Sequence, residues 1–442
     1  MSVVSSLQLC YALSQIGKPL NSNEIQNGTG QFHRINYVKI TILGFALAAL
    51  WSSLHSIILP LRLLDFVAES QKNTYLGLLT FTGLLLAMII QPVAGTISDR
   101  STFHWGRRRP YILLGTAVAL LFLPGIGFAW DYAAIFIIYC LLQISANTTQ
   151  GPYQAFIPDL VPEGKRGLAS GMKGLLEIVG GIALIYPIAL FMDRYFAGEG
   201  SIWLWTVLVM LAIVLLGAMV ATVLTVKEQP VSGKPQPPLL TTFYQTFNTD
   251  VRQNRNFIWF LISRLLVFMA FTTIQQFALN FLQDVIGVTN PAEATARFSI
   301  VAVTGMLAVV YLTGYFSDKI GRKPIAVTAA LLGAIGIAIL FMYQSYGAML
   351  VAAGIIGIAL GAFNSTNWAL ATDLITKGEE ARYLGLANMA TAGGAALARL
   401  IGLVIDFFNN YTPNLGYQVM LGACFVYFVA GSTLLLKIKK VK

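Results

Sequence analysis

Two similar stretches decide the fold: Gly-Thr-Ile-Ser-Asp-Arg at 95–100 followed by Gly-Arg-Arg-Arg-Pro at 106–110, and Gly-Tyr-Phe-Ser-Asp-Lys at 314–319 followed by Gly-Arg-Lys-Pro at 321–324. Each stretch ends a long apolar run. A second pair repeats in the same order, since Pro-Asp-Leu at 158–160 corresponds to Thr-Asp-Leu at 372–374. The chain therefore contains two copies of one unit.

The composition around these motifs is typical of a membrane protein. Of the 442 residues, 56% are hydrophobic and 11% charged, whereas soluble proteins carry about 25% charged residues. A spanning helix needs about 20 mostly apolar residues, and lipid does not tolerate open backbone. Twelve such runs occur, at 37–62, 75–98, 110–129, 131–157, 167–192, 202–226, 256–283, 296–317, 324–343, 347–372, 383–408 and 415–436. We predict an all-α membrane protein of twelve transmembrane helices in two six-helix bundles.

The longest polar interruption divides these runs into two sets of six. It begins with Lys-Glu-Gln-Pro at 227–230 and holds three further prolines, which block a span. We expect a cytosolic tail over 1–36, a first bundle over 37–226, a cytosolic linker over 227–255 and a second bundle over 256–442. Two copies of a six-helix unit predict a pseudo-two-fold axis along the membrane normal, with the solute site between the halves.

The Lys and Arg residues predict the orientation. If both termini are cytosolic, 22 of the 29 lie in inside segments and 4 in outside segments, which satisfies the positive-inside rule. The net charge of +10 is then an orientation signal, so no nucleic-acid partner is required. We predict a multi-pass protein of the cell (inner) membrane.

The repeated motif indicates a gate. An aspartate at a helix end accepts hydrogen bonds from arginines or from a helix N-terminus, and such bonds would lock the cytosolic side in the outward-facing state. The alternative is that the arginines only set the topology. The candidate gating residues are Gly95, Asp99, Arg100, Gly106, Arg107, Arg108, Asp159, Gly314, Asp318, Lys319, Gly321, Arg322, Lys323 and Asp373.

These motifs resemble those of the major facilitator superfamily. The signature Gly-x-x-x-Asp-Arg/Lys-x-Gly-Arg-Arg/Lys is met over 314–323, and in the first copy five residues separate Arg100 from Gly106. That stretched form, with Asn-Thr-Thr-Gln-Gly-Pro-Tyr-Gln-Ala at 147–155, resembles the sucrose–proton symporter branch and its glycoside-transporting relatives. The resemblance implies alternating access around a cavity lined by spans one, four, seven and ten. Where the plant symporters carry an acid and an arginine on the fourth helix, this sequence has Gln143 and Gln154, so those coupling residues are not carried over.

A stripe of amides on span four is the main candidate for solute binding. Gln143, Asn147, Gln150 and Gln154 fall on one helix face, and amides both donate to and accept from sugar hydroxyls. The alternative is that they bond neighbouring helices. The further candidates, on spans one, seven and ten, are Trp51, His55, Gln275, Gln276, Asn364, Asn367 and Trp368.

Four charged residues within spans are candidates for coupling. Lys173 and Glu177 are four apart on span five, which suits either an ion pair or a proton-carrying carboxylate. Arg264 and Arg399 lie on spans seven and eleven. Our hypothesis is that Glu177 or His55 couples proton movement to transport.

The predicted function is secondary active transport of a small polar solute, a sugar or glycoside, with the proton as a candidate co-substrate. The alternatives are export of another metabolite or drug-like compound, and a non-transporting receptor or scaffold. The sequence contains no phosphate loop, paired His-Glu metal motif or nucleophile elbow. We therefore expect no enzyme, no cofactor, no metal and no catalytic residue, and a monomer in the bilayer.

Overall fold

Every element of the computed structural model is a helix in the part of the chain that it describes, which is 34–226, 228, 254–374 and 380–438. Within this part, 12 helices are long and apolar enough to span a membrane. The prediction of an all-α protein with twelve spans is therefore confirmed. The predicted tail, except for its last three residues, and most of the predicted linker lie outside the described residues.

The first half forms six spans, several of them interrupted. Its elements are α3 (Arg34–Ser53), η1 (Leu54–Ile58), α4 (Leu59–Leu63), η2 (Glu69–Gln71), α5 (Lys72–Asp99), α6 (Arg109–Phe122), α7 (Gly125–Phe128), α8 (Tyr132–Gln154), α9 (Phe156–Leu160), η3 (Glu163–Lys165), α10 (Arg166–Ala183), α11 (Ile185–Phe196) and α12 (Ile202–Thr225). The fifth span is broken at Leu184, between α10 and α11. Pro187 explains the break, because a proline lacks the N–H that would bond Ala183 and its ring clashes with that carbonyl.

The second half forms the other six spans. Its elements are α14 (Arg255–Phe281), η5 (Leu282–Ile286), α15 (Pro291–Ile320), α16 (Arg322–Met342), α17 (Tyr346–Leu374), α18 (Glu380–Arg399), α19 (Ile401–Asn409) and α20 (Leu415–Leu436). The helix limits agree with the apolar runs to within a few residues, and the last run coincides with α20. As in the first half, the fifth span of this half is broken, at Leu400 between α18 and α19.

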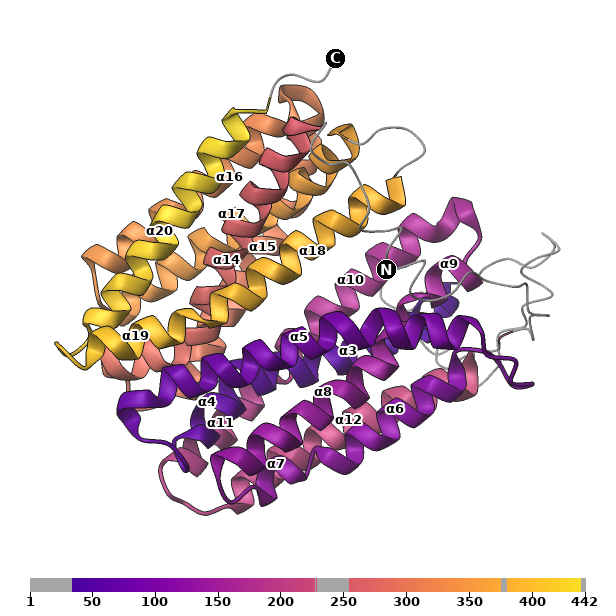
Figure 1. The fold of residues 1–442 in the computed structure, drawn as a ribbon, viewed down its shortest axis with the longest axis horizontal. Helices are drawn as coiled ribbons and strands as arrows, with labels where there is room; N and C mark the ends of the chain where they lie inside the picture. Colours follow the sequence, from indigo (N-terminus) through magenta and orange to yellow (C-terminus); the bar gives the residue numbers. More distant parts are fainter. Residues whose placement is uncertain (1–33, 227, 229–253, 375–379, 439–442) are drawn as a thin grey trace, which may run out of the picture. The chain divides into compact units, whose positions relative to one another are not determined.

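The described residues group into two compact units. Unit 1 contains those of 1–53, 85–185 and 198–239, and unit 2 those of 54–84, 186–197 and 240–442. In unit 1, α3 packs against α10 and α12, and α6 packs against α8. In unit 2, α16 packs against α17 and α20 (Figure 1). We call the helix ends at which the repeated motif lies the motif end, and the opposite ends the far end. Segments 54–84 and 186–197 of the first half, at its far end, thus belong to the same unit as the second half.

Glycines allow the closest helix contacts. Gly357 on α17 lies against the backbone of Ala302 on α15, and a Cβ added at Gly357 would overlap the carbonyl of Ala302. The Gly-x-x-x-Gly spacing of 357–361 therefore serves close helix packing, because Gly361 lies in the same way against Met306.

We expect Gly357→Ala to lower the thermal stability of the purified protein. The added methyl group forces α15 and α17 apart, and overpacking of this kind costs about 1–3 kcal/mol. The control is Gly422→Ala on α20, where nothing lies within 4 Å of the added Cβ and alanine is the better helix former. Melting curves in detergent decide, and equal melting temperatures of the two variants would contradict the packing role of Gly357.

Candidate functional site

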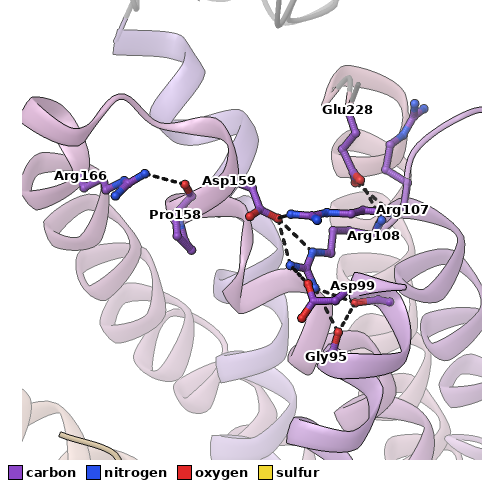
Figure 2. A network of polar contacts seen from close by, with 10 residues as sticks. Gly95, Asp99, Arg107, Arg108, Pro158, Asp159, Arg166 and Glu228 are labelled. Atoms are coloured by element: carbon purple, nitrogen blue, oxygen red, sulfur yellow. Dashed lines mark hydrogen bonds and ion pairs between the residues drawn. The ribbon is translucent and has the colours of Figure 1, made fainter. Parts of the chain in front are cut away.

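The motif end of unit 1 is organised around the side chain of Arg108 (Figure 2). Only 4% of this residue is exposed. Its guanidinium forms an ion pair with Asp99 and bonds one oxygen of Asp159 from both Nε and Nη2, each at 3.0 Å. Nη1 also donates to Gly95 O at 3.1 Å and to Ser98 Oγ at 2.7 Å. One buried arginine therefore connects the end of α5 and the end of span four to the start of α6.

The N-terminus of α6 is capped by Glu228, a residue that lies outside this helix in the sequence. The helix has no side-chain cap of its own, and Glu228 accepts from the backbone N–H of Arg108 at 2.8 Å and of Arg109 at 3.0 Å. Burial raises the pKa of Glu228, and the bonds from these backbone amides partly oppose that shift. Glu228 lies in the predicted linker and is not among the predicted site residues; a lone carboxylate just after span six was its signal in the sequence.

The second glycine of the motif has a conformational role in both copies. Gly106 has φ of 125° and Gly321 has φ of 105°, a region that side chains other than hydrogen disfavour. Each glycine directly precedes the basic residues that begin the next span. The spacing of the motif therefore reflects a backbone turn as well as a charge pattern.

The second copy of the motif repeats this arrangement in a simpler form. Arg322 bonds the carboxylate of Asp373 and donates to Ala369 O at 2.7 Å. Lys323 donates to backbone carbonyls at the end of α20. The side chain of Asp318 lies outside the described residues, and Arg100 and Lys319 are exposed. Both networks join helices within one half, so a lock between the halves stays a prediction.

The four amides of the α8 stripe differ in their hydrogen bonding and in their exposure. Asn147 donates to Gln143 Oε1 at 2.9 Å and accepts from Gln91 of α5 at 2.7 Å, while Gln143 donates to the hydroxyl of Tyr139 at 2.6 Å. Gln143 and Asn147 are each 2% exposed, so their bonds are helix contacts. Gln150 is half-buried and Gln154 is exposed. The motif-end half of the stripe is thus the part with accessible amides.

The charged pair of span five forms in unit 1. Lys173 Nζ lies 3.7 Å from Glu177 Oε1 and 5.3 Å from the centre of the Tyr153 ring. Tyr153 in turn donates to Thr41 O of α3 at 3.0 Å. The side chain of Glu177 is 39% exposed, so the ion pair leaves this carboxylate accessible. Trp51, on α3, is half-buried.

Arg264 is the centre of a polar cluster in unit 2. It is 1% exposed, and its Nε donates to Ala387 O at 3.1 Å and to Thr391 Oγ1 at 2.7 Å. Its Nη1 bonds the carbonyl oxygen of the Asn367 side chain. Its guanidinium lies 4.6 Å from the ring centre of Trp368, a residue that is 37% exposed. Arg264, a coupling candidate on span seven, therefore contacts Asn367 and Trp368, two binding candidates on span ten.

The remaining candidates of unit 2 are more dispersed. Gln276 is 4% exposed and donates to the carbonyl of His55 at 3.4 Å. Gln275 is exposed, Asn364 is half-buried, and Arg399 is 6% exposed and donates to Ala395 O at 2.6 Å. In the described part of the chain, no group of three or more His, Cys, Asp or Glu side chains is placed to hold a metal ion.

Comparison with known proteins finds one matching family model and several similar transport proteins. The sequence model of the Major Facilitator Superfamily matches residues 35–398 and 299–441. The sucrose transport protein SUT1 of Oryza sativa subsp. japonica is 36% identical over 100 residues, a match that covers 18% of this chain and 19% of that protein. A bacterial homolog of the human lysosomal transporter Spinster aligns with TM-score 0.70 and 16% identity over 91% of this chain and 98% of its own. A D-xylose–proton symporter aligns with TM-score 0.67 and 16% identity over 92% and 99%.

Proposed function

Since the chain belongs to the Major Facilitator Superfamily, we propose that it is a secondary active transporter of a sugar or glycoside that works by alternating access. The two halves rock around a central solute site, and solute binding shifts the balance between the two states. Neither half forms or breaks a covalent bond in this mechanism. The charge bias of the sequence supports a cytosolic motif end.

The accessible amides of α8 carry the proposal. Gln150 and Gln154 share a helix face with Gln143 and Asn147, whose amides are already bonded within the protein. Within this stripe, Gln150 and Gln154 are the amides available to a solute. A sugar hydroxyl both donates and accepts, and so does each carboxamide. An uncharged amide also imposes a smaller penalty at bilayer depth than a charged group would.

Trp368 supports the same solute class. A partly exposed indole offers an apolar face for the C–H groups of a sugar ring. Arg264 and Asn367 fix its surroundings, so the ring is held in place before a solute arrives. The sequence match to the rice sucrose transport protein is consistent with a sugar but covers only a fifth of either chain.

Uptake by reconstituted protein tests the proposal. We expect saturable uptake of radiolabelled sucrose, maltose or an aryl glucoside into proteoliposomes. Gln154→Leu should raise KM about tenfold, because one lost hydrogen bond to a solute costs about 1.4 kcal/mol. Gln418→Leu, an exposed amide on α20, is the control and should not change KM. Transport of drug-like cations with no uptake of any sugar would contradict the proposal and favour the exporter.

The same vesicles test proton coupling through Glu177. With coupling, an inward proton gradient accelerates uptake, and Glu177→Gln removes that acceleration because the amide cannot carry a proton. The control is Glu199→Gln, which removes a carboxylate from an exposed loop and should leave the acceleration unchanged. Uptake that is independent of the gradient and unchanged by Glu177→Gln would end the coupling hypothesis.

A further inference from the structure

The N-terminus of α15 is capped by a residue from the other half of the chain. Asn290, at the N-cap position, makes no side-chain cap bond. Instead Asp193, on α11, accepts from the backbone N–H of Ala292 at 2.9 Å and of Glu293 at 2.7 Å, one with each carboxylate oxygen. A carboxylate in this position satisfies two backbone donors and interacts favourably with the helix dipole.

The start of α5 is capped in the opposite direction. Asp406, on α19 in the second half, accepts from the backbone N–H of Thr74 at 2.6 Å and from the Asn73 side chain at 2.8 Å. Asp406 is 4% exposed. A carboxylate of the second half therefore caps a helix of the first half, just as Asp193 of the first half caps a helix of the second.

The two caps occupy equivalent positions of the internal repeat. Thr74 lies 25 residues before Asp99, and Glu293 lies 25 residues before Asp318. Asp193 follows Asp159 by 34 residues, and Asp406 follows Asp373 by 33. Both carboxylates also lie on the short helix that follows the break in the fifth span of their half, α11 after Leu184 and α19 after Leu400.

Neighbouring contacts reinforce both caps. Beside Asp406, Lys72 forms an ion pair with Asp284 at 2.6 Å, and Tyr417 donates to the other oxygen of Asp284 at 2.6 Å. Asn280 donates to Asn73 Oδ1 at 2.7 Å. Beside Asp193, Tyr186 donates to Glu293 at 3.1 Å. These contacts join the two halves of the chain at the far end.

Close backbone contact makes the Asp406 side the tighter of the two. A Cβ added at Gly402 of α19 would overlap the carbonyl of Asn73, and one added at Gly77 of α5 would overlap that of Arg399. The equivalent of Gly77 in the second half is the buried Ala296. The two caps therefore occupy equivalent positions and both use a carboxylate, but the packing around them is unequal.

We propose that Asp193 and Asp406 form a paired latch that holds the far end closed, each by capping the first turn of a helix from the opposite half. Opening the far end separates these helices, so both carboxylates must give up their backbone donors. The breaks at Leu184 and Leu400 let α11 and α19 move with the far end while α10 and α18 stay packed. The latch rests on the alternating access proposed above, but its test requires no solute.

Distance measurements between spin labels test the latch. Labels are placed on the exposed far-end residues Ser70, in the first half, and Thr412, in the second, after alanine has replaced the three native cysteines. We expect Asp193→Ala and Asp406→Ala each to raise the ratio of open to closed far ends about fivefold, the effect of losing one helix cap of about 1 kcal/mol. The double variant should raise it about 25-fold, because separate sites add.

The control is Asp131→Ala. Asp131 caps α8 within its own half by accepting from Ala134 N at 2.7 Å, so its loss should leave the distance distribution unchanged. If an alanine variant does not fold, the asparagine variants keep one acceptor oxygen and should shift the ratio less, in the same direction. The latch is overturned if the Asp193 and Asp406 variants have the same distribution of label distances as the labelled protein without these substitutions. A clear shift in a protein that transports no sugar would leave the latch standing and end only the proposed solute.

Discussion

Replacing Arg108 with alanine is expected to abolish uptake and to lower the melting temperature of the purified transporter sharply. The buried guanidinium is the partner of Asp99 and of Asp159, and it also satisfies Gly95 O and Ser98 Oγ. Its removal takes an ion-pair partner from Asp99 and from Asp159, which are both partly exposed, and takes the Nη1 donor from Gly95 O and Ser98 Oγ. Hydrogen bonds to charged groups contribute about 1.5–3 kcal/mol each, and the ends of three spans lose their connection.

Arg107→Ala is the matched control, since it removes the same charge from the adjacent residue. Among the described residues, Arg107 makes one ion pair, with Asp159 at 2.7 Å, and its side chain is 20% exposed. Partly exposed pairs contribute about 0–1 kcal/mol. Thermal melts and uptake assays of both variants decide. If the two substitutions have equal effects, Arg108 does not organise the motif end and only the total charge matters.

The second large effect is expected at Arg264. Arg264→Gln should lower thermal stability by about 2–4 kcal/mol and reduce uptake at least tenfold. The glutamine cannot reach Ala387 O, Thr391 Oγ1 and Asn367 Oδ1 at once. A buried acceptor that loses its donor, such as Asn367 Oδ1, costs about 1–3 kcal/mol. Trp368 also loses the cation that lies over its ring, so its orientation is no longer fixed.

Two further variants separate charge from geometry at this site. Arg264→Lys keeps the charge and loses the planar fork, so we expect it to recover only part of the stability. Arg255→Gln removes an exposed arginine from the start of the same helix, where it contacts the ring of Trp259; exposed contacts of this kind contribute about 0.5–1 kcal/mol. Full activity of Arg264→Gln would show that the cluster does not position Trp368 for transport.

The polar contacts at the two ends of the helices differ in kind. Among the described residues, the networks of Arg108 and Arg322 join helices of the same half. The caps formed by Asp193 and Asp406 join helices of different halves. In the proposed alternating access, the motif-end networks can persist through a whole cycle, whereas the far-end caps have to break and reform in each one.

The number, type and limits of the spans follow from the amino-acid sequence alone. Each span must separately supply about 20 apolar residues with its backbone bonded internally, so the information is local. That is why the run at 415–436 coincides with α20, and why the repeated Asp and Arg residues mark equivalent positions in both halves. The ion pair of Lys173 with Glu177 is local in the same sense, since a helix brings residues four apart together.

The contacts of each polar side chain depend on how the helices pack in three dimensions. Gln143 and Gln154 share a helix face. The side chain of Gln143 is hydrogen-bonded to Tyr139 and Asn147, whereas Gln154 is exposed. Asp406 caps α5 across more than three hundred residues of sequence. No periodicity encodes such partners, because they depend on how distant helices pack and on which buried donors then lack an acceptor.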